Sequence, residues 1–290
     1  MQLESSSLHI TVLPEVGGKV ARIFDKRSNR SLLVSPQTGY RTVPVGDSWM
    51  NYDKSGMDDC FPNIARGIHP DRGSGSIVLP DLGEWVYGTW EAVFNSRWEI
   101  ALQRRGTSLP YQATKRIAFV NDDTLRFDYS IAHCGDAPFR YMWCAHPLFA
   151  VDGAFAVRLP GTRLLYRKFP FDGEIRHWPV RNEIDLSRQW IPQGTTLKTF
   201  VSGLEEGWCE LSVNDQSLRL GFDLKVTPFL GIWFNNFGFP QEAPYRCIAL
   251  EPCTSQSDLL DPSEGSWDPV LSPGAKAEWW FTLQVSALAP

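Results

Sequence analysis

Apolar and polar residues alternate with a period of two along much of the chain. Between residues 125 and 131, for example, Leu125, Phe127, Tyr129 and Ile131 are apolar or aromatic, and the residues between them are polar. Such alternation predicts a β-strand with one buried side and one side in water. On this basis we expect strands at 8–13, 19–25, 98–103, 113–120, 124–131, 139–146, 154–159, 207–213, 218–223, 229–234, 245–251 and 276–286.

Turn-forming residues lie between these segments, at 14–18, 121–123, 135–138 and 214–215. We find no long segment with the 3.6-residue period of an amphipathic helix. One small barrel cannot hold this many antiparallel strands. The sequence therefore predicts an all-β fold in the form of a large antiparallel sandwich of two extended sheets. Because no linker or repeat divides the chain, we expect residues 1–290 to form one domain.

Two segments do not follow the strand pattern. Residues 35–90 are rich in Gly, Pro, Asp and Trp, and residues 160–205 contain four prolines. Long irregular segments in a compact domain usually cover or build a functional site. We therefore expect both segments to form the walls of a pocket on one sheet face.

Charge and cysteine content exclude several classes of protein. The chain has 28 Lys and Arg against 33 Asp and Glu, with no basic run longer than Lys26-Arg27, which argues against binding to nucleic acid. There is no apolar window long enough to cross a membrane, and no basic segment followed by an apolar stretch at the start, so we expect a cytoplasmic protein. The six cysteines lack paired spacing, which favours reduced thiols over a metal cluster.

Two ionisable residues end apolar segments and directly precede proline. His146 follows an aromatic run that includes Trp143, and Glu251 follows residues 248–250. An ionisable group at the end of a buried strand costs free energy unless it is paired or used. Burial would raise the pKa of Glu251 toward that of a general base, and histidine transfers protons near pH 7. The alternatives are a core histidine bonded to a carbonyl and a glutamate that emerges into a loop.

Acidic and aromatic residues also gather in the segment 35–90. Carboxylates accept paired hydrogen bonds from neighbouring hydroxyls, and indole rings cover the C–H face of a sugar. The residues we expect to bind such a ligand are Asp59, Glu84, Trp85, Trp143, Trp233 and Asn235. The alternative is that the acids are solvated and the tryptophans fill the sandwich core.

At this point several strings resemble one known family. Residues 143–149 (WCAHPLF) and 248–252 (IALEP) resemble two hallmarks of the aldose 1-epimerase (galactose mutarotase-like) superfamily. Residues 13–20 (LPEVGGKV) resemble the start of that family, and residues 58–62 (DDCFP) and 81–85 (DLGEW) resemble motifs of its bacterial branch. The resemblance extends over residues 8–287, and it depends on the order and spacing of the motifs together.

The resemblance implies a β-supersandwich with its site on a concave sheet face, and no metal or organic cofactor. In mutarotases a glutamate takes the proton of the anomeric hydroxyl while a histidine protonates the ring oxygen. The ring opens, the aldehyde rotates, and closure gives either anomer. By motif, Glu251 would be the base and His146 the acid.

The sequence departs from the family at two points. The family's second histidine precedes a glycine in the segment that here reads 80–84, and this chain has Leu82 at that place. Leucine neither donates to a sugar hydroxyl nor carries a proton. The family's asparagine–arginine pair has no clear counterpart either, although Arg66 lies nearby in the sequence.

We therefore expect a cofactor-free sugar epimerase that acts on a small-molecule carbohydrate. A catalytically weak or inert sugar-binding protein on the same fold is the first alternative. A lyase or hydrolase is the second, for which Asp58, Asp59 and Glu84 could supply paired carboxylates. A phosphorylated substrate would require an arginine cluster, for which the candidates are Arg66, Arg72, Arg140 and Arg176.

Overall fold

The computed structural model describes residues 1–71, 77–261 and 267–288, and almost all of its regular structure is β-strand. Predicted strand limits agree closely with the observed ones: β2 (Leu8–Leu13) and β3 (Lys19–Asp25) coincide with them. The segment predicted at 139–146 is interrupted instead, because β12 (Phe139–Arg140) and β13 (Cys144–Pro147) pair with different strands. The all-β prediction is confirmed.

Within the described residues, twelve strands form the sheet that we call the large sheet. Its order is β1 (Gln2–Glu4), β2, β3, β5 (Met57–Cys60), β13, β24 (Arg246–Cys253), β23 (Phe229–Asn236), β20 (Thr195–Ser202), β16 (Leu165–Phe169) and β17 (Arg176–His177). Two short strands, β4 (Arg30–Ser31) and β14 (Phe149–Ala150), pair with β3 and β24 beside this path.

Eight further strands of the described chain form the second sheet. Its order is β15 (Phe155–Arg158), β21 (Trp208–Val213), β22 (Gln216–Phe222), β26 (Lys276–Ala287), β11 (Thr124–His133), β10 (Tyr111–Asn121), β9 (Glu99–Arg105) and β8 (Glu91–Asn95). All the pairings in both sheets are antiparallel, including those between strands that are far apart in the sequence, such as β13 and β24.

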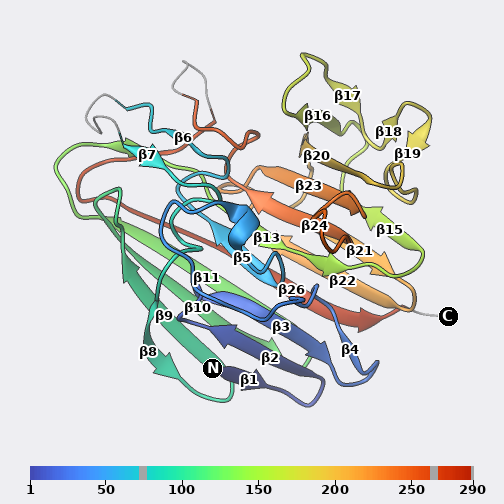
Figure 1. Ribbon diagram of the computed structural model, residues 1–290, viewed down its shortest axis with the longest axis horizontal. Helices are drawn as coiled ribbons and strands as arrows, with labels where there is room; N and C mark the ends of the chain where they lie inside the picture. Colours follow the sequence, from blue (N-terminus) through green and yellow to red (C-terminus); the bar gives the residue numbers. More distant parts are fainter. Residues whose placement is uncertain (72–76, 262–266, 289–290) are drawn as a thin grey trace.

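Short elements complete the regular structure. Three two-stranded sheets pair β12 with β25 (Val270–Leu271), β18 (Val180–Arg181) with β19 (Ile184–Asp185), and β6 (Gly67–Ile68) with β7 (Val78–Leu79). The one helix of the described residues is the 3-10 turn η1 (Trp49–Asn51), which lies over β5 and β13 in Figure 1. Within this part of the chain, no helix has the length and apolar character needed to cross a membrane.

The two sheets pack against each other around one cluster of buried apolar side chains. The large sheet contributes Ile248 and Leu250, for example, and the second sheet contributes Phe127 and Leu283. Because side chains alternate across a strand, the neighbours of Ile248 in β24 face the other way, and Ala249 belongs to a separate cluster. The large sheet therefore has an inner face on the core and an outer face.

The two irregular segments lie toward one end of the molecule. The short strands β6 and β7 of the first segment, and β16 to β19 of the second, appear along the upper edge of Figure 1. The second segment contains more strand than the sequence indicated. Its strand β20 lies inside the large sheet, between β16 and β23.

Candidate functional site

Strand alternation brings His146 and Glu251 to the outer face of the large sheet. Ala145 of β13 and Trp143 just before this strand belong to the core cluster, so His146 faces the opposite side. In β24, Leu250 is in the core cluster, so Glu251 also faces outward. The two strands are neighbours, and both residues meet on one surface.

His146 and Glu251 are in direct contact. The Nδ1 atom of His146 lies 2.8 Å from Oε1 of Glu251. A proton on Nδ1 satisfies this contact, which leaves Nε2 free to accept a proton or, in the imidazolium, to donate one. Nε2 is buried and has no hydrogen-bond partner among the described residues. The pair therefore presents one unused proton-transfer atom.

A lysine that sequence analysis did not single out completes this group. Lys198 of β20 forms an ion pair with Oε2 of Glu251, and the Cys144 thiol donates to the same oxygen at 3.3 Å. Burial alone would raise the pKa of Glu251, but the charges of Lys198 and His146 outweigh burial and lower it to about 2. The expectation of a raised pKa for Glu251 is therefore wrong. Glu251 is thus ionised at neutral pH, and 0% of its surface is exposed.

Gly231 makes room for this ion pair. In the register of the sheet, Gly231 of β23 lies directly opposite Glu251 of β24 and Phe200 of β20. A Cβ at this position would lie 2.8 Å from Oε2 of Glu251 and 3.3 Å from Nζ of Lys198. The missing side chain at 231 is thus what allows the lysine and the glutamate to meet across β23.

A cavity of about 200 Å³ opens above these residues. His146 and Lys198 lie in it together with Trp233, whereas Trp49, Ile64, Ala65 and Leu82 come from the irregular segment 35–90. The Trp49 ring stacks on Phe239 at 4.7 Å and meets Trp233 edge-on at 6.3 Å, which fixes an aromatic wall. Leu82 thus occupies a pocket position, at the place where the family motif has histidine.

Two carboxylates, Asp81 and Asp258, also line the cavity. Asp258 lies 4.0 Å from Lys198, measured from Oδ1 to Nζ, and this Oδ1 is buried without a hydrogen-bond partner among the described residues. Burial is the main cause that raises the pKa of Asp258 to about 6, although Lys198 opposes it. Burial also raises the pKa of Asp81. Neither residue is among the predicted site residues. In the motif 81–85 the predicted residues are Glu84 and Trp85, and Asp258 lies in a loop without a distinctive pattern.

Asp59 does not reach the cavity. In β5, Asp58 lies on the outer face beside His146 in the register, so Asp59 points the other way, into the core. There its carboxylate is 2.6 Å from Nζ of Lys115 and accepts a hydrogen bond of 2.8 Å from the Tyr129 hydroxyl. The prediction that Asp59 binds ligand is replaced by a structural role that joins the two sheets.

Glu84 and Trp85 are also internal. The Glu84 carboxylate accepts hydrogen bonds from Ser108 N at 2.8 Å and from the Tyr111 hydroxyl at 2.5 Å, and both Thr107 donors point to it. The Trp85 ring is fully buried and stacks on Phe61 at 4.5 Å. Both side chains therefore anchor the segment 80–90 to the second sheet and do not line the cavity.

Trp143 and Asn235, two more of the predicted binding residues, do not line the cavity, whereas Trp233 does. Trp143 is fully buried between the sheets, with its ring 4.9 Å from that of Tyr129. Asn235 faces outward, but its side-chain oxygen accepts hydrogen bonds of 3.0 Å from Gly238 and Phe239, and its amide donates to the Phe239 carbonyl. Asn235 thus shapes the loop that carries Phe239 against Trp49. Trp233 alone of the predicted binding residues lines the cavity.

The arginine candidates do not form a cluster at this cavity. Arg140 forms an ion pair with Asp71 at 3.2 Å, and Arg176 pairs with Asp172 and Glu174. The backbone of Arg66 donates to the carboxylate of Asp81. Arg72 lies outside the described residues. Within the described part of the chain, no group of three or more His, Cys, Asp or Glu side chains is placed to hold a metal ion.

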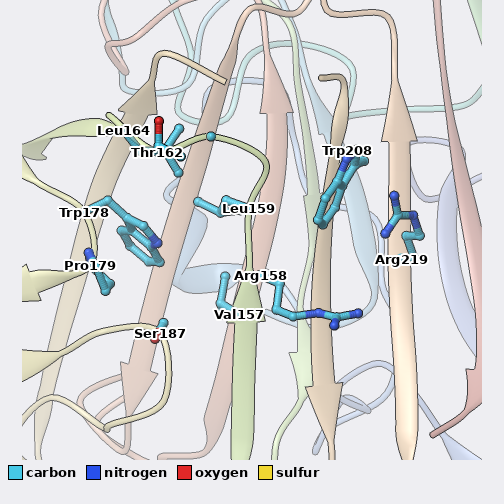
Figure 2. Close-up of a pocket in the computed structure, with 11 residues that line it drawn as sticks. Val157, Arg158, Leu159, Thr162, Leu164, Trp178, Pro179, Ser187, Trp208 and Arg219 are labelled. Carbon is cyan, nitrogen blue, oxygen red and sulfur yellow. The ribbon is translucent and has the colours of Figure 1, made fainter. Parts of the chain in front are cut away.

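A second, more open cavity of about 620 Å³ lies at the edge of the second sheet. Figure 2 shows Trp178 and Trp208 on opposite sides of it, with Leu159 between them. Its charged groups already have partners: Arg158 lies 2.5 Å from Glu210, and the Arg219 guanidinium lies 3.9 Å from the centre of the Trp208 ring. The smaller cavity is the one that presents unpaired, buried proton-transfer atoms, so we take it as the candidate site.

Solved structures of mutarotase-like proteins match this architecture over nearly the whole chain. A candidate aldose 1-epimerase from Escherichia coli K12 matches with a TM-score of 0.77 at 16% identity, covering 99% of this chain and 98% of that one. A galactose mutarotase-like protein from Lactobacillus casei ATCC 334 matches with a TM-score of 0.75 at 14% identity, covering 99% of both chains. The chain has the galactose mutarotase-like fold.

The same galactose mutarotase-like fold is found in an aldose epimerase homologue from C. elegans. That structure matches with a TM-score of 0.72 at 15% identity, covering 100% of this chain and 99% of that one. No protein-family model matches the sequence, and no curated protein matches it either. The family resemblance of the sequence motifs is thus confirmed in the fold.

Proposed function

We propose that this protein is a cofactor-free sugar epimerase that interconverts the anomers of an aldose at C1. The observation that carries the proposal is the His146–Glu251 contact of 2.8 Å. His146 lines the cavity, and its Nε2 atom has no hydrogen-bond partner among the described residues. Anomer interconversion requires a proton donor at the ring oxygen and a proton acceptor at the anomeric hydroxyl. Both steps are within the reach of general acid–base groups in one pocket.

His146 and Glu251 act as one proton-handling unit in this mechanism. Glu251 accepts the Nδ1 hydrogen bond, which holds the ring in place and stabilises the imidazolium. Nε2 then gives its proton to the ring oxygen as the C1–O5 bond breaks, and it recovers the proton when the ring closes. Lys198 keeps Glu251 ionised, so that the anion remains available to the histidine throughout.

The cavity favours an uncharged monosaccharide. Its volume of about 200 Å³ is below the usual range of about 300–1,000 Å³ for drug-sized ligands, which suits one sugar ring. Trp49 and Trp233 line the cavity with aromatic surface that suits its C–H groups. Asp81 and Asp258 would repel a phosphate or carboxylate, and Lys198 is already engaged by Glu251. A small-molecule carbohydrate without an anionic group is therefore the proposed substrate.

NMR saturation exchange on a panel of aldoses and their phosphates tests this function. We expect the wild type to accelerate α–β exchange of at least one unphosphorylated aldose, and His146→Gln to lose about 10²–10⁴-fold of that acceleration. His177→Gln, at an exposed position of β17, is the matched control and should leave the rate unchanged. Wild-type protein without acceleration on any member of the panel would contradict the proposal.

A catalytically weak sugar-binding protein is the second candidate. It is favoured by the ion pair with Lys198, because a carboxylate with a pKa of about 2 is a poor base at neutral pH. Leu82 in the cavity wall also offers no proton. Ligand line broadening in the same NMR experiment, without acceleration, would favour this candidate.

A further inference from the structure

The geometry leaves Glu251 without access to a ligand. It has 0% of its surface exposed, one oxygen accepts from His146, and the other lies against Lys198 and Cys144. To reach the anomeric hydroxyl, Glu251 would have to abandon these partners, including the buried ammonium of Lys198. Breaking a buried ion pair in this way is strongly destabilising, because it leaves a charge buried without its partner.

Asp258 satisfies the requirements that Glu251 does not. It lines the cavity with His146, and its Oδ1 is buried without a hydrogen-bond partner among the described residues. The residue is 9% exposed. A buried polar atom without a partner in a sugar-sized cavity is an acceptor that a ligand hydroxyl can satisfy.

The backbone holds Asp258 in a fixed position against the cavity wall. Its carbonyl oxygen accepts hydrogen bonds from Ile64 N at 3.2 Å and Ala65 N at 2.7 Å, and both of these residues line the same cavity. The backbone that carries the carboxylate is therefore anchored to the wall that would contact the sugar, which favours positioning for proton transfer.

We propose that Asp258, rather than Glu251, is the base that takes the proton of the anomeric hydroxyl, with His146 as the acid on the ring oxygen. This assignment rests on the proposed epimerase function. Glu251 and Lys198 become positioning residues: Glu251 acts through His146, and Lys198 acts through Glu251 and Asp258.

The proton balance of the step is closed. In ring opening, the O1–H proton moves to the Asp258 carboxylate, C1=O1 forms, the C1–O5 bond breaks, and O5 takes the proton of the His146 imidazolium. After rotation about C1–C2, O5 attacks the other face of C1. The O5 proton returns to His146, and Asp258 gives its proton to O1. Both groups end in their starting states.

The charged groups around Asp258 suit this role. Lys198 on β20 and His146 on β13 favour the ionised carboxylate of Asp258. Glu251 on β24 and Asp81, in the loop after β7, disfavour it. With burial as the largest cause, the pKa of Asp258 rises to about 6. Asp258 is thus ionised at neutral pH and is a stronger base than an ordinary aspartate.

Rates of anomer exchange for wild type, Asp258→Asn and Asp81→Asn test the assignment. We expect Asp258→Asn to lose at least about 10²-fold in kcat with the sugar Kd changed by less than about threefold. Asp81→Asn removes the other cavity carboxylate and should lose less than about tenfold. In Asp258→Ala, added formate should restore part of the rate, which a merely structural role for Asp258 would not allow.

The pH profile separates Asp258 from Glu251. The wild-type rate should fall as pH drops through about 6, where Asp258 takes up a proton. This fall should persist in Glu251→Gln and be absent from the residual rate of Asp258→Asn. If the wild type is active and the kcat of Asp258→Asn is within threefold of it, Asp258 is not the base, and the proposed epimerase function still stands. A wild type that accelerates no sugar overturns the proposed epimerase and this base with it.

Discussion

Lys198 and Glu251 form a buried ion pair across β23, over the one residue of that strand, Gly231, that has no side chain to separate them. The pair determines the charge state of the whole site. It keeps Glu251 ionised beneath His146, and it brings a cation within 4.0 Å of Asp258.

Removing the lysine should destabilise the fold in a pH-dependent manner. In Lys198→Met, burial is no longer opposed by the lysine charge, so the pKa of Glu251 rises above its unfolded value of 4.5. A raised folded pKa gives stability that is present below the unfolded pKa and is lost as pH rises through the folded pKa. We expect a loss of about 3–5 kcal/mol in the free energy of unfolding at pH 7.5, and a smaller loss at pH 5.

Urea unfolding at the two pH values measures this difference. Lys225→Met, at an exposed position, is the control and should change stability by less than about 0.5 kcal/mol at either pH. An equal loss at both pH values in Lys198→Met would mean that Glu251 does not depend on the lysine for its charge.

A methyl group at position 231 should disturb the site more than the fold. In Gly231→Ala, the new Cβ would lie 2.8 Å from Oε2 of Glu251, so the carboxylate has to move away from Lys198 or from His146. We expect anomer exchange to slow by about tenfold or more, with a stability loss of about 1–3 kcal/mol. The same substitution in a Glu251→Ala background should cost much less stability, because the opposing oxygen is gone. Additive effects in this double-mutant cycle would contradict the steric account.

Asp258 should stabilise the folded state less than a neutral residue of the same shape. Its folded pKa of about 6 lies above the unfolded value of 3.8, so its favourable contribution is present below pH 3.8 and is lost as pH rises through 6. At pH 7.5 the loss amounts to about 3 kcal/mol at most. Asp258→Asn should therefore gain stability relative to wild type between pH 4 and pH 7.

Parallel urea titrations of wild type and Asp258→Asn across this pH range provide the measurement. Glu251 contributes with the opposite sign, since its lowered pKa gives stability above pH 4.5 that is lost as pH falls through about 2. The pH range in which Glu251 changes the stability therefore lies mostly below the range in which Asp258 does. A constant difference between the two proteins from pH 4 to pH 7 would mean that Asp258 titrates normally.

The core carboxylate of β5 should affect stability without affecting the ligand. Asp59→Asn leaves Lys115, which is buried, without its counter-charge, and we expect a loss of about 3–5 kcal/mol. Replacing both partners by apolar residues, in Asp59→Leu with Lys115→Met, should recover most of this loss. Sugar affinity, measured by calorimetry on folded protein, should be unchanged in both variants. A weakened affinity in Asp59→Asn would restore the ligand-binding role that the sequence suggested.

The sequence predicts the strands well because alternation is a local property. It predicts residue placement less well where the strand itself is short or buried on both sides. In β5 all four residues are buried, so no contrast of polarity indicates that Asp58 faces outward and Asp59 inward. The same holds for Trp143 in the interrupted strand before His146, where an aromatic run fits a core and a sugar site equally well.

Lys198 and Asp258 were missed for different reasons. Lys198 lies in a run of β-branched and aromatic residues, Thr195 to Val201, which has strand character. The four prolines that precede this run, at positions 160, 170, 179 and 192, indicate an irregular segment instead. Asp258 lies in a loop, and its role depends on the wall residues Ile64 and Ala65, which are far away in the sequence. His146 and Glu251 could be found because each ends an apolar segment at a proline.

The division of the cavity between strands and loops has a consequence for protein engineering. His146, Glu251 and Lys198 are held by three strands of the large sheet, whereas Trp49, Ile64, Ala65 and Leu82 belong to the connections on either side of β5. Exchange of the side chains at these positions can therefore alter which molecules are admitted, while the sheet retains His146, Glu251 and Lys198 and the backbone of Ile64 and Ala65 still holds Asp258. A library restricted to these four wall positions is a direct route to altered sugar selectivity on an unchanged framework.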